Sequence, residues 1–151
     1  MGKRDLLTKL LAWIGTLVIW LVLLTPVFFS AMRYIQSSRF RFDWLMPAEF
    51  APAALIGGLL LFWAALRAKS QSRPIAWGLL IAIVMLTAGQ AYAVYSGLAS
   101  GETEATGLPW LIVVVSLGLY VLGLLITGWS GLRLLTNLNK KVVLPKGTAR
   151  S

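Results

Sequence analysis

The chain has 151 residues, of which 58% are hydrophobic, and its mean hydropathy is +0.80, which is too apolar for a soluble domain of this size. Its formal net charge is +9, and only 13% of its residues are charged. The absence of histidine and cysteine excludes thiol redox chemistry, structural zinc, histidine-ligated haem and Ser–His catalysis, and no metal, cofactor or catalytic residue is expected.

Four long apolar stretches predict four transmembrane helices, because a span needs about 20 apolar residues at a rise of about 1.5 Å each. The uncharged runs are Leu10–Met32, Phe50–Leu66, Pro74–Ser100 and Thr106–Leu132. With flanking residues, the expected spans cover approximately 9–32, 47–67, 74–99 and 108–133, with an outer connection at 33–46 and a basic cytoplasmic tail at 134–151. The sequence therefore predicts an all-α integral membrane protein with a single domain over residues 1–151.

The first stretch is expected to be a retained helix and not a cleaved signal peptide. Its apolar run is longer than the roughly 7–15 residues of a signal-peptide core. Phe28 and Phe29 also stand where small residues would precede a cleavage site. Pro26 lies deep in this run, so it is expected to bend the helix or to mark its outer end.

Lysine and arginine are distributed unevenly among the segments between the spans. The N-terminal arm, the second connection and the C-terminal tail together carry 11 of them, whereas the first connection carries three and the third carries none. Because positive charge is retained on the cytoplasmic side, both termini of this multi-pass protein of the cell membrane are expected in the cytoplasm. The cations are expected to face anionic lipid headgroups, and nucleic acid is not an expected partner.

Small residues recur at three- and four-residue spacing in each span and predict the helix faces that pack together. These seams are Ala54, Gly58, Leu61 and Ala65 in the second span, Gly78, Ala82, Met85, Gly89, Tyr92 and Ser96 in the third, and Ser116, Tyr120, Gly123, Thr127 and Ser130 in the fourth. The first span offers only Ala12, Gly15 and Thr16, and is expected to be the most exposed to lipid. Short connections and this spacing predict an antiparallel up-down-up-down four-helix bundle.

The outer connection contains alternating charged and aromatic residues, Arg39-Phe40-Arg41-Phe42-Asp43-Trp44. Period-two alternation in an extended segment places Arg39, Arg41 and Asp43 on one side. Together with Glu49 they form a candidate site for an anion or a partner. One interpretation is that the arginines reach lipid phosphates and are offset by the two acids. The other is a site for an anionic headgroup, a lipid-linked polymer or a partner subunit, because guanidinium suits phosphate.

A second candidate site is polar and lies within the third span. Gln90 stands near the middle of this span, and Tyr92 and Tyr95 follow it. The simpler interpretation is an interhelical hydrogen bond of Gln90, worth about 1 kcal/mol.

Three functions remain open. The first is a small non-enzymatic membrane protein, such as a subunit, an accessory factor or an envelope sensor, which acts with a partner subunit or as a homo-oligomer. The second is a small oligomeric transporter, because the chain resembles the small multidrug-resistance transporters in size and number of spans. That resemblance implies a buried glutamate in the first span, but Leu10–Met32 has none, and Glu49 lies only at the edge of the second. The third is a lipid-modifying enzyme that would use the site in the outer connection.

Overall fold

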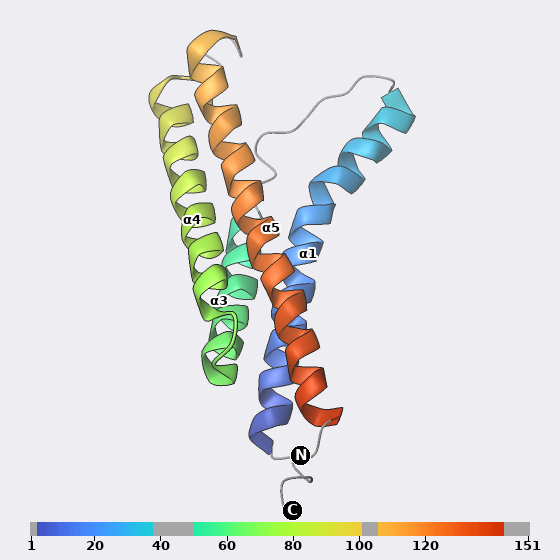
Figure 1. The fold of residues 1–151 in the computed structure, drawn as a ribbon. Coiled ribbons are helices and arrows are strands. Elements are labelled where there is room, and N and C mark those ends of the chain that lie inside the picture. Colours follow the sequence, from blue (N-terminus) through green and yellow to red (C-terminus); the bar gives the residue numbers. More distant parts are fainter. Residues whose placement is uncertain (1–2, 38–49, 101–105, 144–151) are drawn as a thin grey trace, which may run out of the picture.

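The computed structural model describes residues 3–37, 50–100 and 106–143, and describes side chains over 6–28, 50–100 and 106–140. These residues form four helices, which are α1 (Lys3–Ser37), α3 (Ala51–Ala68), α4 (Ser72–Tyr95) and α5 (Gly107–Val143), as labelled in Figure 1. The described part of the chain is all-helical. Each of the four helices is long and apolar enough to span a membrane.

Two helices continue well beyond the apolar runs that identified them. Helix α1 extends past Arg33 to Ser37, and α5 extends past Arg133 to Val143. Charged and polar residues end an apolar run, but arginine, lysine and glutamine are good helix formers and do not end a helix. Helix α3 is shorter, with 18 residues, and begins at Ala51 with Pro52 in its first turn, where proline costs no hydrogen bond.

The connection between α3 and α4 is short and uses two residues in the left-handed region. Lys69 has φ +49° and Gln71 has φ +60°. The N–H of Lys69 donates to the Leu66 carbonyl and that of Ser70 to the Ala65 carbonyl, which is the hydrogen-bond pattern of a Schellman motif. The Nδ2 atom of Asn137 on α5 lies 3.4 Å from the Ser70 hydroxyl and contacts the connection from the side.

Helices α4 and α5 pack with their backbones in contact. A Cβ atom placed on Gly123 would lie 2.6 Å from the carbonyl oxygen of Gly78, and one on Gly78 would lie 2.8 Å from the carbonyl oxygen of Gly123. Further along, a Cβ on Gly89 would lie 2.8 Å from the Cβ of Ser116. Glycine is therefore required here because the two backbones leave no room for a side chain.

Helices α1 and α3 form a second close pair. A Cβ atom on Gly15 would lie 2.8 Å from the carbonyl oxygen of Gly57 and 2.9 Å from the amide nitrogen of Leu61. The two pairs meet where the second half of α5 passes along α1, and there a Cβ on Gly131 would lie 2.6 Å from the Thr16 hydroxyl. In Figure 1, α5 lies beside α4 in its first half and beside α1 in its second, while the far half of α1 leans away.

Two buried clusters hold the four helices together, and each draws residues from all of them. The first cluster contains Ala12, Leu61, Ala64, Ala65, Ile75 and Leu134. The second contains Ile19, Val22, Ala54, Ala82, Tyr120 and Leu124. The core is thus continuous across both pairs.

The small-residue seams predicted from the sequence are the faces that the structure buries. The seam residues of α3 and most of those of α5 are buried, which agrees with the spacing argument. In the third span Gly78, Ala82 and Gly89 are buried, whereas Met85, Tyr92 and Ser96 are only partly buried. The expectation that the first helix would be the most exposed is not confirmed, because α1 shares the lowest buried fraction with two other helices. The most apolar windows of α1, α4 and α5 each bury 28% of their residues. In α1 the short seam is extended at the same spacing by Thr8 and by two larger residues, Ile19 and Val22, all of which are buried.

Candidate functional site

Most hydroxyl groups inside the bundle donate to the backbone of their own helix. The Thr16 hydroxyl donates to the Ala12 carbonyl at 2.7 Å, and the Thr127 hydroxyl donates to the Gly123 carbonyl at 2.9 Å. Ser116 does the same with Ile112 at 2.8 Å. These groups satisfy their hydrogen-bonding needs locally, so they can be buried against another helix without a partner there.

Two buried polar atoms have no hydrogen-bond partner among the residues that the structure describes. They are the Tyr120 hydroxyl and the Nε1 atom of Trp20. Leaving such a donor unpaired costs about 1–3 kcal/mol, so each calls for an explanation. The Trp20 ring packs on the backbone of α5, where a Cβ on Gly128 would lie 3.4 Å from Nε1, and there is no space for another group. Tyr120, in contrast, lies beside a cavity.

The cavity has a volume of about 140 Å³ and lies between α3, α4 and α5. Its lining is mainly aliphatic and consists of Ala51, Ala54, Leu55, Leu79, Ala82, Ile83, Leu86, Thr87, Tyr120 and Leu124. Two lining residues carry a hydroxyl, but that of Thr87 already donates to the Ile83 carbonyl at 2.8 Å. Tyr120 contributes to the wall, but its hydroxyl oxygen has less than 1 Å² of accessible surface and so does not face the cavity.

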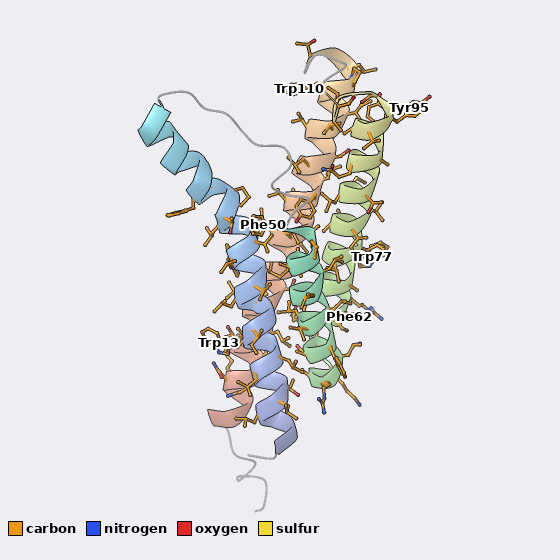
Figure 2. The ribbon with its side chains drawn as sticks, turned by 180° about the vertical axis from the view of Figure 1, so that it is seen from behind. Trp13, Phe50, Phe62, Trp77, Tyr95 and Trp110 are labelled. Atoms are coloured by element: carbon orange, nitrogen blue, oxygen red, sulfur yellow. The ribbon has the colours of Figure 1, made fainter. Side chains whose placement is uncertain are left out.

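The surroundings of the cavity explain how a ligand could reach it. Leu55 and Ile83, which contribute to its lining, are 37% and 39% exposed, so the cavity opens on the outer surface of the bundle. Ala51 and Ala54 belong to the first turns of α3, and α3 begins part-way along the bundle, beside Phe50 in Figure 2. Tyr120 is only 4% exposed and forms part of the deep wall.

The predicted polar site of the third span is not gathered into one group. Gln90 is partly buried and lies one helical turn beyond Leu86, on the side of α4 that lines the cavity. Tyr92 and Tyr95 are three residues apart and share another side of α4. Tyr95 is 90% exposed and lies with Trp110 at one end of the bundle in Figure 2.

The site predicted in the outer connection lies outside the described residues, since Arg39, Arg41, Asp43 and Glu49 all fall within 38–49. It remains a prediction. Within the residues that the structure does describe, no group of three or more histidine, cysteine, aspartate or glutamate residues is placed to hold a metal ion.

Sequence reasoning assigned Tyr120 to a packing seam and missed its link to a cavity. The available signal was its size and polarity, because it stands among glycine, serine and threonine where a small side chain would suffice. Comparison with known protein families, curated proteins and solved structures gave no match. Function is therefore inferred from the residues and contacts of this chain.

Proposed function

We propose that this is a multi-pass protein of the cell membrane, with both termini in the cytoplasm, that acts as a non-enzymatic subunit or accessory factor. The apolar helices and the cation distribution support insertion and orientation. The order of contacts supports an up-down-up-down bundle. Gly78 faces Gly123 and Thr127, whereas Gly89 faces Ser116. Residue numbers therefore increase along α4 in the direction in which they decrease along α5, as expected for antiparallel helices.

The observation that carries the proposed role is the close packing of the interior. Both helix pairs bring backbone atoms within contact of glycine, and buried hydroxyls donate to their own helices. Over the helical residues that the structure describes, such an interior leaves little room for a polar pathway. A scaffold that presents apolar helix faces to lipid and to a partner needs no such pathway.

A small oligomeric transporter is the second candidate, but the cavity described above is too small to hold its substrate. Sites for drug-sized molecules typically occupy about 300–1,000 Å³, whereas the cavity between α3, α4 and α5 has about 140 Å³. A transporter built from this chain would need a pathway between copies and would depend on Glu49. Proton-coupled export from vesicles that is abolished by Glu49→Gln would favour this alternative.

The subunit role can be tested by photo-crosslinking in native membranes. One photoreactive residue at a time would replace Leu17 on α1, Leu59 on α3, Leu80 on α4 or Leu122 on α5, which are all between 51% and 56% exposed. We expect a protein adduct of one defined mass from one or two neighbouring faces, and lipid adducts from the others. An adduct of twice the chain mass would identify a homo-oligomer. Lipid adducts alone from all four positions would contradict the proposal.

A third possibility is a lipid-modifying enzyme, which would have to use Arg39, Arg41, Asp43 and Glu49. Headgroup turnover by the purified protein would favour it over the subunit role. The same residues could serve the proposed subunit by contacting anionic headgroups or the partner at the membrane surface.

A further inference from the structure

We propose that one anionic phospholipid, with two phosphates in its headgroup, binds where α5 contacts the α3–α4 connection. The site, called the basic cluster below, consists of Lys69, Ser70, Arg133, Asn137 and Lys140. It lies at the end of the bundle that is proposed to face the cytoplasm. The proposal rests on the membrane insertion inferred above, but it does not depend on which partner subunit the protein has.

The first observation is that the cluster joins two segments that are far apart in the sequence. Arg133, Asn137 and Lys140 are four and three residues apart, so they lie along one side of α5. The Nδ2 atom of Asn137 lies 3.4 Å from the hydroxyl oxygen of Ser70. This contact holds the α3–α4 connection, in which Lys69 precedes Ser70, against that side of α5. Three cations are thus gathered at one polar contact between two segments.

The second observation is that the surroundings of the cluster contain little negative charge. Lys69, Arg133 and Lys140 are exposed, and the ranges whose side chains the structure describes include no aspartate or glutamate. Asp5 is the one acid in the three segments assigned to the cytoplasm, and it belongs to α1. Helix α1 contacts α5 at Gly131, and Arg133, two residues further, lies on roughly the opposite side of α5. The cluster therefore attracts an anion that comes from outside this part of the chain.

The third observation identifies the source of that anion. Trp129 precedes Arg133 by four residues, lies one turn away on the same side of α5, and is 58% exposed. This side of the helix therefore changes from apolar to cationic at Arg133, where the uncharged run also ends. A phospholipid has the same order of groups, with acyl chains that would contact Trp129 and phosphate that would contact Arg133. A soluble anion would leave the apolar half of this surface unused.

The fourth observation concerns the length and charge of the cluster. Arg133 and Lys140 are seven residues apart, or about 10 Å along α5, and the headgroup layer on each side of a bilayer is about 5–8 Å thick. The cluster thus covers the whole depth of this layer. Arg133 can bind a phosphate through two N–H donors, and Lys69 and Lys140 supply compact charges. One phosphate would leave two of the three charges unneutralised, whereas two phosphates would leave one.

The test uses purified full-length protein in a neutral detergent, titrated with one lipid at a time and followed by native mass spectrometry. The lipids are cardiolipin with two phosphates, phosphatidylglycerol with one, and zwitterionic phosphatidylcholine. We expect one retained cardiolipin per chain, bound about fivefold more tightly than phosphatidylglycerol, because its second phosphate contacts a further cation. Phosphatidylcholine should not be retained. Inorganic pyrophosphate, a soluble ion with two phosphates, should not displace cardiolipin.

Matched variants separate a site from net charge. Arg133→Gln and Lys140→Gln should each weaken cardiolipin binding about fivefold, because each removes one cation from the cluster. Arg73→Gln removes one cation from the same end of the bundle and is the control, because Arg73 shares the exposed side of α4 with Trp77. It should leave binding unchanged. Asn137→Ala keeps the net charge but removes the contact with the connection, and should weaken binding about two- to tenfold.

Four results would each overturn the proposal. Equal losses in Arg73→Gln and Arg133→Gln would show that net charge alone explains binding. Equal retention of phosphatidylglycerol and cardiolipin would remove the requirement for two phosphates, and displacement by pyrophosphate would identify a soluble anion as the ligand. Cardiolipin binding that survives Arg133→Gln, Lys140→Gln and Asn137→Ala would place the lipid elsewhere. These outcomes leave the crosslinking result for the subunit role unchanged, so the two proposals fail separately.

Discussion

Replacing Gly123 with alanine tests whether backbone contact between α4 and α5 stabilises the bundle. The added Cβ would lie 2.6 Å from the carbonyl oxygen of Gly78 and 2.8 Å from the amide nitrogen of Ala82, whereas ordinary contact begins at 3.4 Å. Both neighbours are backbone atoms and cannot rotate away. The helices must therefore separate by about 0.8 Å at this point, and overpacking of this kind typically costs about 1–3 kcal/mol.

The higher helix propensity of alanine partly offsets the cost of overpacking, so a control variant is needed to separate the two effects. Alanine favours a helix over glycine by about 1 kcal/mol, so the net destabilisation by Gly123→Ala should be about 0–2 kcal/mol. Gly118 lies on the same helix, and a Cβ there would meet nothing within 4 Å. Gly118→Ala should therefore show only the gain in helix propensity, and it should leave the free energy of unfolding unchanged or raise it.

The assay is reversible unfolding of the purified variants in mixed micelles with a rising fraction of SDS, followed by tryptophan fluorescence. We expect the two variants to differ by about 1–3 kcal/mol in free energy of unfolding, with Gly123→Ala the less stable. Equal stability of Gly123→Ala and Gly118→Ala would refute the close approach of α4 and α5.

Other predictions concern topology, the α3–α4 connection and the outer arginines. A single cysteine should label from outside the cell at Thr103, in the third connection, but not at Ser70, and external labelling at Ser70 would reverse the proposed orientation. Lys69→Gly should stabilise the bundle by about 0.5–1 kcal/mol in SDS unfolding, because glycine adopts the left-handed conformation without strain. As the control, Arg67→Gly lies within the last turn of α3 and should destabilise the bundle by about 1 kcal/mol. Arg41→Lys should lower the yield of the partner adduct if a planar guanidinium grips an anion, and an unchanged yield would leave only the anchoring interpretation.

The number of helices and their buried faces could be predicted from the sequence because both depend on local patterns. Apolar runs without charge identify helices in lipid, where every backbone group must be paired within the segment. Small residues at helical spacing identify close contacts, as the buried positions Gly78, Gly89 and Gly123 show. Helix ends were harder to place. The same residues that leave the apolar core, such as Arg133 and Lys140, continue α5 as good helix formers.

The cavity was harder to predict from the sequence, because it depends on which helices pack against one another. Tyr120 has the spacing of a packing residue, and its pattern alone cannot show that its hydroxyl finds no partner. Ala51 and Ala54 likewise look like seam residues. Only the spacing between α3 and α4 decides whether an alanine contacts a backbone or faces empty volume.

That spacing has an identifiable cause. Where α4 meets α5, Gly78 and Gly123 face backbone atoms of the other helix, and the two helices approach until those atoms touch. Where α3 meets α4, Gly58 instead faces the side chain of Leu79, which occupies the space that a Cβ would take. A leucine side chain holds two helices further apart than a backbone does. Toward the start of α3, Ala51 and Ala54 line the same cavity as Leu86 and Thr87 of α4. Gly123 thus brings α4 and α5 into contact because it faces a backbone, whereas the Leu79 side chain keeps α3 and α4 apart next to the cavity that they share with α5.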